Sequence, residues 1–410
     1  MRTRIFALVC TLLLTGNAWG LIFYDGWPIG RTDTAPFELV ISVPKGTEDV
    51  IDRGNIRDPT SVWVELIDRA ERSIDFAFFY VTSIPNESLG LVLDAIERAG
   101  KRGVPMRFIV DKKMTKVTRN DDADGLRRLA AIPSLRLMFI DYETIAGGVH
   151  HPKYFIVDGR DAYLGSQNFD WRALSHIHEL GIRTNDACTV TNLSAVFEHD
   201  WQKQLALTHG SDYVASATPY PICAVSCAEP RLAASPPSQT PVGMQDAEAA
   251  LLALIGQTKK ELAIEVMTYS LKRRSGGAYR TLDNALRAAA RRGVHVMLMV
   301  DAKRAESHYD ALFSLATEDG IDVRAVSIPE QQEAFGSISY ARLIHAKYMV
   351  VDGKTLWVGT HNWSGDYFAK MRNISLTLPD SDLAKKARRL HADIWNSAYA
   401  KDIRNFRPKP

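Results

Sequence analysis

The chain has few cysteines, no long apolar run and almost no net charge. Its 410 residues carry 50 Lys and Arg against 48 Asp and Glu, a formal net charge of +2. Overall charge therefore gives no support to a strongly electrostatic polyanion binder, and any affinity for anions must be local. No C-x-x-C pair and no Cys/His cluster with zinc spacing occurs, which argues against metal binding through cysteine. Cys188, Cys223 and Cys227 allow at most one disulfide in an oxidising compartment, and their pairing stays open.

The N-terminus is typical of a secretory signal peptide. Arg2 and Arg4 form a basic start, residues 5–14 a short apolar run and residues 18–20 a small-x-small cleavage site. The alternative, an uncleaved membrane anchor, needs roughly 20 apolar residues, and this run is shorter. We expect cleavage after residue 20, no stable membrane insertion afterwards, and a secreted or periplasmic protein.

One plan of helices and strands occurs twice along the chain. In the first copy, strands expected at residues 74–82 and 104–110 enclose a helix that ends at Gly103. In the second copy, strands expected at residues 262–268 and 294–300 enclose a helix that ends at Gly293. Short apolar strands that alternate with helices predict an α/β fold, here two pseudo-symmetric halves, each a mixed sheet flanked by helices, packed around a shared active-site cleft. The predicted division is a signal peptide at 1–20, a first half at 21–214, a Pro/Ser-rich surface connection at 215–242 and a second half at 243–410.

The strongest feature is a pair of matching motifs. The segments at 151–158 and 345–352 both read H-x-K-x-x-x-x-D, and a G-[ST]-x-N run follows each of them. The corresponding residues are separated by one constant offset in every case. A single copy of so short a motif would be weak evidence, but two complete copies in register are not a coincidence. The paired residues are His151 and His345, Lys153 and Lys347, Asp158 and Asp352, Ser166 and Thr360, and Asn168 and Asn362.

The local geometry and the residue types predict a site for a phosphate oxyanion. If His-x-Lys lies on a strand, both side chains point to one face. The Asp-Gly pairs that end the motifs predict hairpin turns, and an Asp at such a position is as often a turn residue as a chemical one. Two ammonium groups, two imidazoles and neutral donors suit a phosphoryl group, whereas a divalent cation would need several carboxylates. One histidine can attack phosphorus while the other protonates the leaving oxygen and then activates water.

These motifs resemble those of the phospholipase D superfamily. The resemblance is closest to the branch of phospholipase D family members three and four, which are 5′ exonucleases. It is carried by G-V-H-H-P-K-Y-F-I-V-D, Y-L-G-S-Q-N-F-D-W-R-A-L and H-E-L-G in the first half, and by H-A-K-Y-M-V and V-G-T-H-N-W-S-G-D-Y-F in the second. It extends over roughly residues 23–402. The resemblance implies a phosphodiesterase that works through a covalent phosphohistidine, with no metal, no cofactor and no obligatory protein partner. This chain departs from the mammalian proteins in having fewer cysteines.

The resemblance also suggests how the two histidines divide the work. Glu179 follows His151 at the same spacing along the chain as Asn373 follows His345. In the superfamily, a carboxylate at this place can hold the histidine of its own motif, and such a carboxylate makes the imidazole a better nucleophile. We therefore expect His151 to attack and His345 to act as acid and then base. Lys153, Lys347, Asn168 and Asn362 are expected to bind the phosphate oxygens, with Ser166, Thr360 and Asn373 as helpers.

Three substrate classes compete at this stage. The branch favours single-stranded nucleic acid, and the aromatics near the motifs could stack on bases, although most of them flank buried strands and could equally be core. These aromatics are Tyr154, Phe169, Trp171, Tyr340, Tyr348 and Trp363. Hydrolysis or transphosphatidylation of phospholipids is the alternative, but no basic amphipathic helix announces membrane docking. An inactive binding module is the third, and the intact His and Lys of both motifs disfavour it.

Overall fold

The computed structural model describes residues 35–114, 123–210, 222–223, 229–274, 276–330 and 338–407. The predicted signal peptide therefore lies outside the described residues. Residues 36–410 form one compact unit. The strands of the first half are β1 (Phe37–Ser42), β2 (Ile74–Phe78), β3 (Val81–Thr82), β4 (Met106–Asp111), β5 (Leu135–Ile140), β6 (Tyr154–Val157), β7 (Asp161–Gly165), β8 (Phe169–Asp170) and β9 (Glu179–Thr184). Its helices are α1 (Pro59–Asp68), α2 (Ser88–Lys101), η1 (Lys112–Met114), α4 (Ala123–Ala130), α5 (Tyr142–Ala146), α6 (Trp171–Ser175) and α7 (Ala187–His209).

The second half repeats this series of elements. Its strands are β10 (Arg231–Ser235), β11 (Gln245–Asp246), β12 (Glu261–Val266), β13 (His295–Asp301), β14 (Ile321–Val326), β15 (Tyr348–Val351), β16 (Thr355–Gly359), β17 (Asn373–Leu378) and β18 (Ala400–Asp402). Its helices are η2 (Pro237–Gln239), α8 (Ala247–Gln257), α9 (Thr281–Arg291), α10 (Ala302–Ser307), α11 (Tyr309–Ala316), α12 (Gly365–Ala369) and α13 (Ser381–Trp395).

Two mixed sheets follow one strand order, which confirms the predicted fold class. The first sheet is β1-β9-β7-β6-β2-β4-β5, and the second contains β10-β17-β16-β15-β12-β13-β14 in the equivalent places. In both sheets three neighbouring strands are parallel, β2-β4-β5 and β12-β13-β14. The strand that follows the His-x-Lys segment, β6 or β15, pairs antiparallel with the first of these three. The second sheet is extended by β11 at one edge and β18 at the other.

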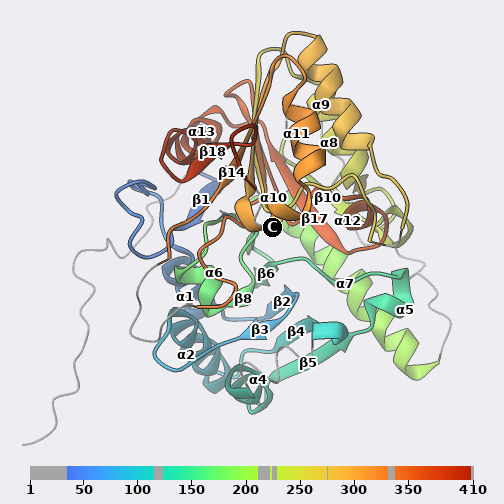
Figure 1. Ribbon diagram of the computed structural model, residues 1–410. Coiled ribbons are helices and arrows are strands. Elements are labelled where there is room, and N and C mark those ends of the chain that lie inside the picture. Colours follow the sequence, from blue (N-terminus) through green and yellow to red (C-terminus); the bar gives the residue numbers. More distant parts are fainter. Residues whose placement is uncertain are drawn as a thin grey trace, which may run out of the picture. The chain divides into compact units, whose positions relative to one another are not determined.

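The two sheets and their helices form layers (Figure 1). One core cluster packs α1, α2 and α4 on the first sheet, and another packs α8, α9 and α11 on the second. A third cluster draws residues from β6, β7, β9 and α7 together with residues from β15, β16, β17 and α13. The two halves are thus joined by a shared apolar core between the sheets.

Local signals explain several of these elements. Asp58 caps α1 by accepting a hydrogen bond from the Ser61 N–H at 3.0 Å, and Pro59 takes the first helical position. The two Asp-Gly pairs form the predicted hairpin turns. Both residues of each pair have positive φ, between 53° and 66°, as a type I′ turn requires.

The predicted connection between the halves is partly wrong. Residues 231–235 are not a surface loop but strand β10, which pairs antiparallel with β17 as β1 pairs with β9. The run Leu232-Ala233-Ala234 is buried, and its small apolar residues fit a strand that lies between β11 and β17. The prolines that suggested a loop lie on both sides of this strand.

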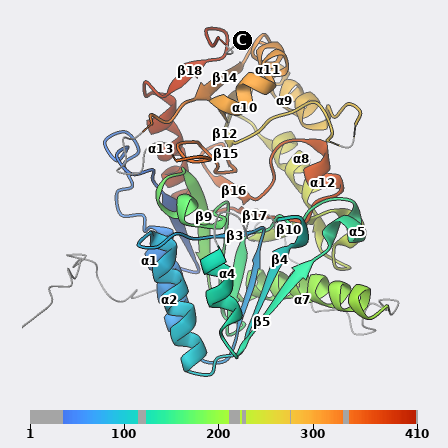
Figure 2. The same ribbon diagram turned by 60° about the horizontal axis from the view of Figure 1, so that its bottom comes forward.

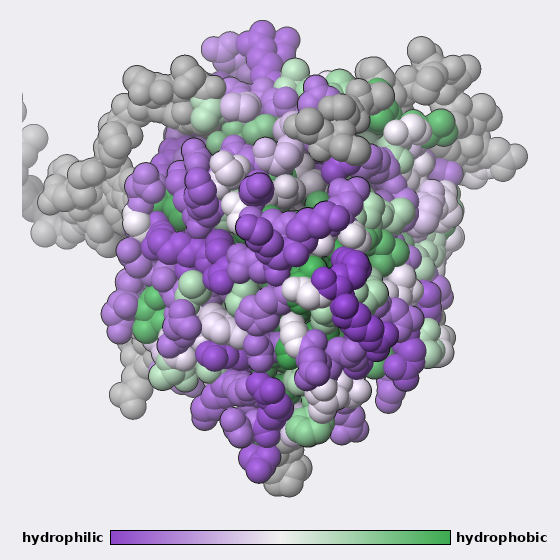
Figure 3. Space-filling view, turned by 90° about the horizontal axis from the view of Figure 1, so that it is seen from above, coloured by the Kyte–Doolittle hydropathy of each residue, from purple (hydrophilic) through white to green (hydrophobic). Residues whose placement is uncertain are grey.

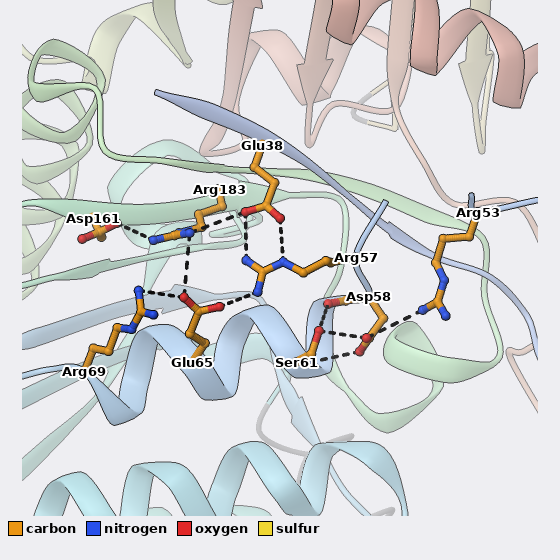
Figure 4. A network of polar contacts seen from close by, with 9 residues as sticks. All are labelled: Glu38, Arg53, Arg57, Asp58, Ser61, Glu65, Arg69, Asp161 and Arg183. Atoms are coloured by element: carbon orange, nitrogen blue, oxygen red, sulfur yellow. Dashed lines mark hydrogen bonds and ion pairs between the residues drawn. The ribbon is translucent and has the colours of Figure 1, made fainter. Parts of the chain in front are cut away.

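A polar network fastens the edge strand of the first sheet (Figure 4). Arg57 forms ion pairs with Glu38 on β1 and Glu65 on α1. Arg183 on β9 contacts the same Glu38 at 3.6 Å. β9 is the strand that begins with Glu179, so this network holds the strand that delivers a predicted site residue.

The described part of the chain contains no helix long and apolar enough to cross a membrane. The face that lies over the second half is mostly hydrophilic, with hydrophobic side chains scattered among polar ones (Figure 3).

Candidate active site

The two His-x-Lys segments lie immediately before the motif strands, not within them. β6 begins at Tyr154 and β15 at Tyr348, so the prediction that the His-x-Lys segments lie on strands is wrong. The reason is that backbone groups of His151 and His345 pair with the opposite half. The His151 N–H donates to the Arg372 carbonyl at 2.9 Å, and the His345 N–H donates to the His178 carbonyl at 2.8 Å.

These crossed backbone contacts form two equivalent bridges between the halves. One joins His150 to Arg372, and the other joins His178 to Ile344. His178 and Arg372 are related by the same offset as the two motifs, so the bridges obey the internal repeat. Glu179 follows His178, and Asn373 follows Arg372. Each bridge therefore places a residue of one half beside the histidine of the other half.

Glu179 and Asn373 make the corresponding side-chain contacts. Glu179 Oε1 lies 2.7 Å from Nδ1 of His345, and Asn373 Oδ1 lies 2.9 Å from Nδ1 of His151. The expectation that Glu179 holds the histidine of its own motif is therefore wrong. In both contacts an oxygen accepts at Nδ1, which leaves Nε2 of each ring as the nitrogen with an available lone pair.

Both histidines are buried among positive charges. His151 is 5% exposed and His345 is 8% exposed. Burial lowers the pKa of each imidazole well below its ordinary value, and the ammonium groups of Lys153 and Lys347 lower both values further. The two rings are consequently neutral near pH 7 in the empty site. Neutral imidazole is the form that can attack phosphorus.

The pKa values of Glu179 and Lys347 are both shifted toward pH 7. Burial raises the pKa of Glu179 to about 8, against the opposing effect of Lys347. Burial lowers the pKa of Lys347 to about 7, against the opposing effect of Glu179. A phosphate brought beside Lys347 would favour its charged form, because an opposite charge in a buried site stabilises the ion. The site is thus prepared to receive an anion.

The lysines are oriented by their own motifs. Lys153 Nζ donates to the carbonyl oxygen of His151 at 2.7 Å, and Lys347 Nζ donates to that of His345. Both side chains are fully buried. An ammonium group has three protons to donate, so each lysine keeps donors for a ligand.

The residues after the motif glycines divide into two kinds. Asn168 and Asn362 each have one buried amide oxygen without a hydrogen-bond partner among the described residues. These oxygens are acceptors, so the groups of the two carboxamides that can donate to a phosphate are their N–H groups, one of which in Asn362 donates to Tyr367 Oη at 2.9 Å. Thr360 instead donates to Asn373 Oδ1 at 2.9 Å, and Ser166 Oγ donates to the Leu180 carbonyl at 3.1 Å. The two hydroxyls are thus engaged with the segments that carry Glu179 and Asn373.

The two motif aspartates do not reach the cluster. Asp158 lies at the far end of β6, five residues and therefore on the order of 15 Å from Lys153. Its carboxylate accepts from the backbone N–H groups of residues 71–73, and the carboxylate of Asp352 accepts from those of residues 259–261. Burial works to raise the pKa of both carboxyls, but these N–H groups outweigh it and hold each pKa below its usual range. The two aspartates therefore fix the loops that precede β2 and β12.

Two aromatic rings beside His151 could not be identified from the sequence. The ring centroid of Phe79 lies 4.8 Å from that of His151, and the centroid of Tyr367 lies 5.3 Å away. Both residues are half-buried. Phe79 follows a buried strand without any polar signal, so only the position of the strand end could have suggested it. Of the six aromatics considered from the sequence, only Tyr340 is exposed, and the others are buried in the core.

Two buried charge pairs stand directly behind the crossed contacts. Arg372, next to Asn373, forms three hydrogen bonds with the carboxylate of Asp200 on α7. His178, next to Glu179, lies 3.4 Å from Glu265 on β12. All four side chains are almost completely buried. No group of three or more His, Cys, Asp or Glu suited to a metal occurs within the described ranges.

Comparison with known proteins agrees with this arrangement. The family model described as "Cardiolipin synthase, PLD-like domain" matches residues 63–201 and 251–395, one stretch in each half. The protein named "5'-3' exonuclease PLD3" is 30% identical in Xenopus laevis, covering 90% of this chain and 81% of the relative. The protein of that name in Macaca fascicularis is 31% identical, covering 89% and 80%.

Other similar proteins carry phospholipid names. "Phospholipase D Z" of Dictyostelium discoideum is 28% identical and covers 98% of both chains. Among solved structures, phosphatidylserine synthase of Haemophilus influenzae superposes with a TM-score of 0.61 at 13% identity, covering 84% of this chain and 85% of that one. This last likeness concerns the fold alone. The duplicated motif, the repeated sheets and the family match together establish that the chain belongs to the phospholipase D superfamily of phosphodiesterases.

Proposed function

We propose that the protein is a 5′ exonuclease that hydrolyses single-stranded nucleic acid through a phosphohistidine. The observation that carries this proposal is the pair of buried His-x-Lys motifs, each with Nδ1 of its histidine held by an oxygen from the other half. Relatives named 5′-3′ exonuclease support the choice of substrate. The half-buried rings of Phe79 and Tyr367 beside His151 offer surfaces on which a base could stack.

The asymmetry of the two contacts assigns the chemical roles. The positive charge that His345 gains when Nε2 bonds to phosphorus favours the ionised form of Glu179, and the carboxylate at Nδ1 then stabilises that charge, whereas a carboxamide cannot ionise. His345, held by Glu179, is therefore the nucleophile, which reverses the assignment expected from the sequence. His151, held by Asn373, is the general acid and base.

The reaction then runs in two balanced steps. The bound phosphate anion favours the protonated form of His151, which then carries a proton on Nε2. Nε2 of His345 attacks phosphorus, the bond to the leaving oxygen breaks, and His151 gives its Nε2 proton to that oxygen. Water next loses a proton to His151 and attacks phosphorus, and the bond between nitrogen and phosphorus breaks. Lys153, Lys347, Asn168 and Asn362 bind the non-bridging oxygens, where their donors would stabilise the charge of the transition state. The positive charge comes from protein side chains, so we also propose that no metal is required.

The mature protein would act outside the cytoplasm. This part of the proposal rests on the basic start, apolar run and small-x-small site of residues 2–20. N-terminal sequencing of protein recovered from the periplasm or medium should begin near Leu21. A chain that keeps Met1, or stays in the cell with its leader, would contradict it.

Parallel assays with chelator present test the proposed activity. The mature protein and the His345→Ala control are incubated with a 5′-hydroxyl single-stranded oligonucleotide and with phosphatidylcholine vesicles. We expect stepwise shortening from the 5′ end by the native protein only. Release of choline without cleavage of the oligonucleotide would favour the phospholipase alternative, which relatives named phospholipase D suggest. Loss of all activity in chelator would contradict the metal-free mechanism.

A further inference from the structure

A cavity of about 360 Å³ opens beside the segment that leads to His151. One wall is formed by Gly147, Gly148 and Val149, and the facing wall by Asp366, Lys370 and Met371. The first wall runs directly into His150 and His151, and the second into Arg372 and Asn373. The cavity volume falls within the roughly 300–1,000 Å³ typical of small-ligand pockets.

The two halves approach each other closely at the cavity. A Cβ placed on Gly148 would lie 2.4 Å from the Lys370 carbonyl oxygen, so only glycine allows this backbone contact. α5 precedes one wall, and α12 contributes Asp366 to the other. Both helices lie at the same side of the molecule in two views (Figures 1 and 2). The ring of Tyr367, on α12 between Asp366 and Lys370, touches the ring of His151. The cavity therefore adjoins the candidate active site.

The charges around the cavity favour an anion. Its lining contains the cations Lys113, Arg274 and Lys370 and the carboxylates Glu143 and Asp366. Lys113 pairs with Glu143, and both side chains are about half exposed. Within the described residues, the side chains of Arg274 and Lys370 make no hydrogen bond or ion pair. Two cations from different elements thus face one space with no partner in the described part of the chain.

We propose that this cavity is a subsite for a second phosphate of the substrate strand, bound by Lys370 and Arg274. The inference rests on the proposed function, because a nucleic-acid strand presents a further phosphate one nucleotide from the bond that is cleaved. A phosphatidylcholine molecule has a single phosphodiester and gives these cations nothing equivalent to bind. The subsite would therefore favour strands over lipids and would place the end of the strand against the histidines.

The test compares a long and a short substrate. The Lys370→Ala/Arg274→Ala protein and the native protein are assayed on a single-stranded decanucleotide and on bis(4-nitrophenyl) phosphate, which has one phosphodiester. We expect the ratio of kcat/KM for the decanucleotide to that for the small ester to fall about tenfold or more. The dependence of log kcat/KM on log salt for the decanucleotide should also weaken, by about 0.7 for each phosphate that is no longer bound. Lys354→Ala, at the exposed turn after Asp352, is the matched control, and its ratio should equal that of the native protein.

The outcomes separate the subsite from the proposed function. An unchanged ratio and salt dependence, with the decanucleotide cleaved, would overturn the subsite and leave the exonuclease proposal standing. An equal loss on both substrates would also overturn it, because the effect would then lie in the active site itself. A native protein that cleaves the small ester but not the decanucleotide would overturn the proposed function and the subsite with it.

A separate observation concerns two cysteines on the first half. Cys188 and Asn192 are four residues apart on α7 and therefore share one face. Asn192 Oδ1 accepts from the Cys223 N–H at 3.0 Å, and Asn192 Nδ2 donates to the Cys223 carbonyl at 3.4 Å. Burial and hydrogen-bond contact with the Cys223 thiol raise the pKa of Cys188 to about 12. In the structure the two residues are free thiols that lie close to each other.

We infer that Cys188 and Cys223 form a disulfide that fastens the connection between the halves to α7. The two thiols lose two protons and two electrons in forming the bond, and an oxidising protein or small-molecule disulfide takes up both and becomes two thiols. Protein prepared from an oxidising compartment should yield one peptide pair linked through Cys188 and Cys223, and two fewer titratable thiols than after reduction. The Cys227→Ser variant should keep the bridge. A link from Cys227 to either residue, or no loss of thiols after treatment with glutathione disulfide, would overturn the inference.

Discussion

The two halves share one architecture but hold their histidines differently. Both sheets have the same order, both motifs have the same spacing, and both histidines are contacted from across the interface. The first half gives His345 a carboxylate, and the second half gives His151 a carboxamide. Because the histidines, lysines and asparagines of the two halves are matched in pairs, this difference is the basis on which the proposed mechanism separates a nucleophile from an acid and base. In the proposed mechanism, the two similar halves thus differ in role through the side chains of Glu179 and Asn373.

The proposed difference between the two histidines is tested most directly by removing each of them in turn. His345→Ala and His151→Ala should each lower kcat by about 10³-fold or more, because both groups act in the chemical steps. Only the His151→Ala protein should accumulate a covalent phosphoenzyme. The measurement uses a strand labelled at the first internucleotide phosphate, followed by peptide mapping. Label on a peptide that contains His345 supports the assignment, and label at residue 151 in the His345→Ala protein would reverse it.

Changing the two supporting residues should give a smaller and unequal effect. Glu179→Gln should lower kcat by roughly 10²–10⁴-fold, because an amide cannot offset the charge of the imidazolium and can stabilise the wrong tautomer. Asn373→Ala should cost about tenfold, since His151 loses a neutral acceptor and keeps its backbone hydrogen bond to Arg372. Both variants need melting curves near that of the native protein before their rates are compared. Equal losses at the two positions would contradict the division of roles.

The pH profile should carry the same asymmetry. The acid limb of kcat/KM belongs to protonation of His345, whose pKa is lowered, so this limb should lie well below pH 6.5. The alkaline limb follows loss of the proton from His151, whose pKa is also lowered, and of the charge on Lys347, whose pKa is about 7. Activity should therefore be greatest below pH 7 and fall up to tenfold per pH unit above it. A maximum above pH 8 in a profile from pH 4 to pH 9 would be incompatible with these shifts.

Much of the fold could be predicted from the sequence because its signals are local. Buried strands, helix ends and the Asp-Gly turns depend on residues a few positions apart, and each was found near its expected place. The histidine contacts depend instead on the bridge between His178 and Ile344, which belong to different halves of the chain. The spacing from each histidine to Glu179 or Asn373 is equal in both halves and holds no information about which histidine Glu179 faces. The aromatics could not be sorted either, since core rings and site rings follow similar apolar strands.

The smallest expected effect on activity concerns the aspartates that complete the written motif. Asp158→Ala and Asp352→Ala each leave the backbone N–H groups of three residues without their acceptor. We expect each change to lower the free energy of unfolding by about 1–3 kcal/mol, measured by denaturant titration at pH 7.

The pH dependence of this stabilisation distinguishes a structural aspartate from a chemical one. Because the folded-state pKa of each aspartate is below its unfolded value, the stabilisation is complete above about pH 4 and is lost as the pH falls through the folded pKa. The difference in stability between each variant and the native protein should therefore shrink in acid. Their kcat should stay within a few-fold of the native value wherever they are folded, because neither carboxylate lies near the histidines. A 10²-fold loss of kcat in a folded Asp352→Ala protein would mean that this aspartate takes part in the chemistry. The Asp at one end of each motif would then have to act together with the His and Lys at the other end.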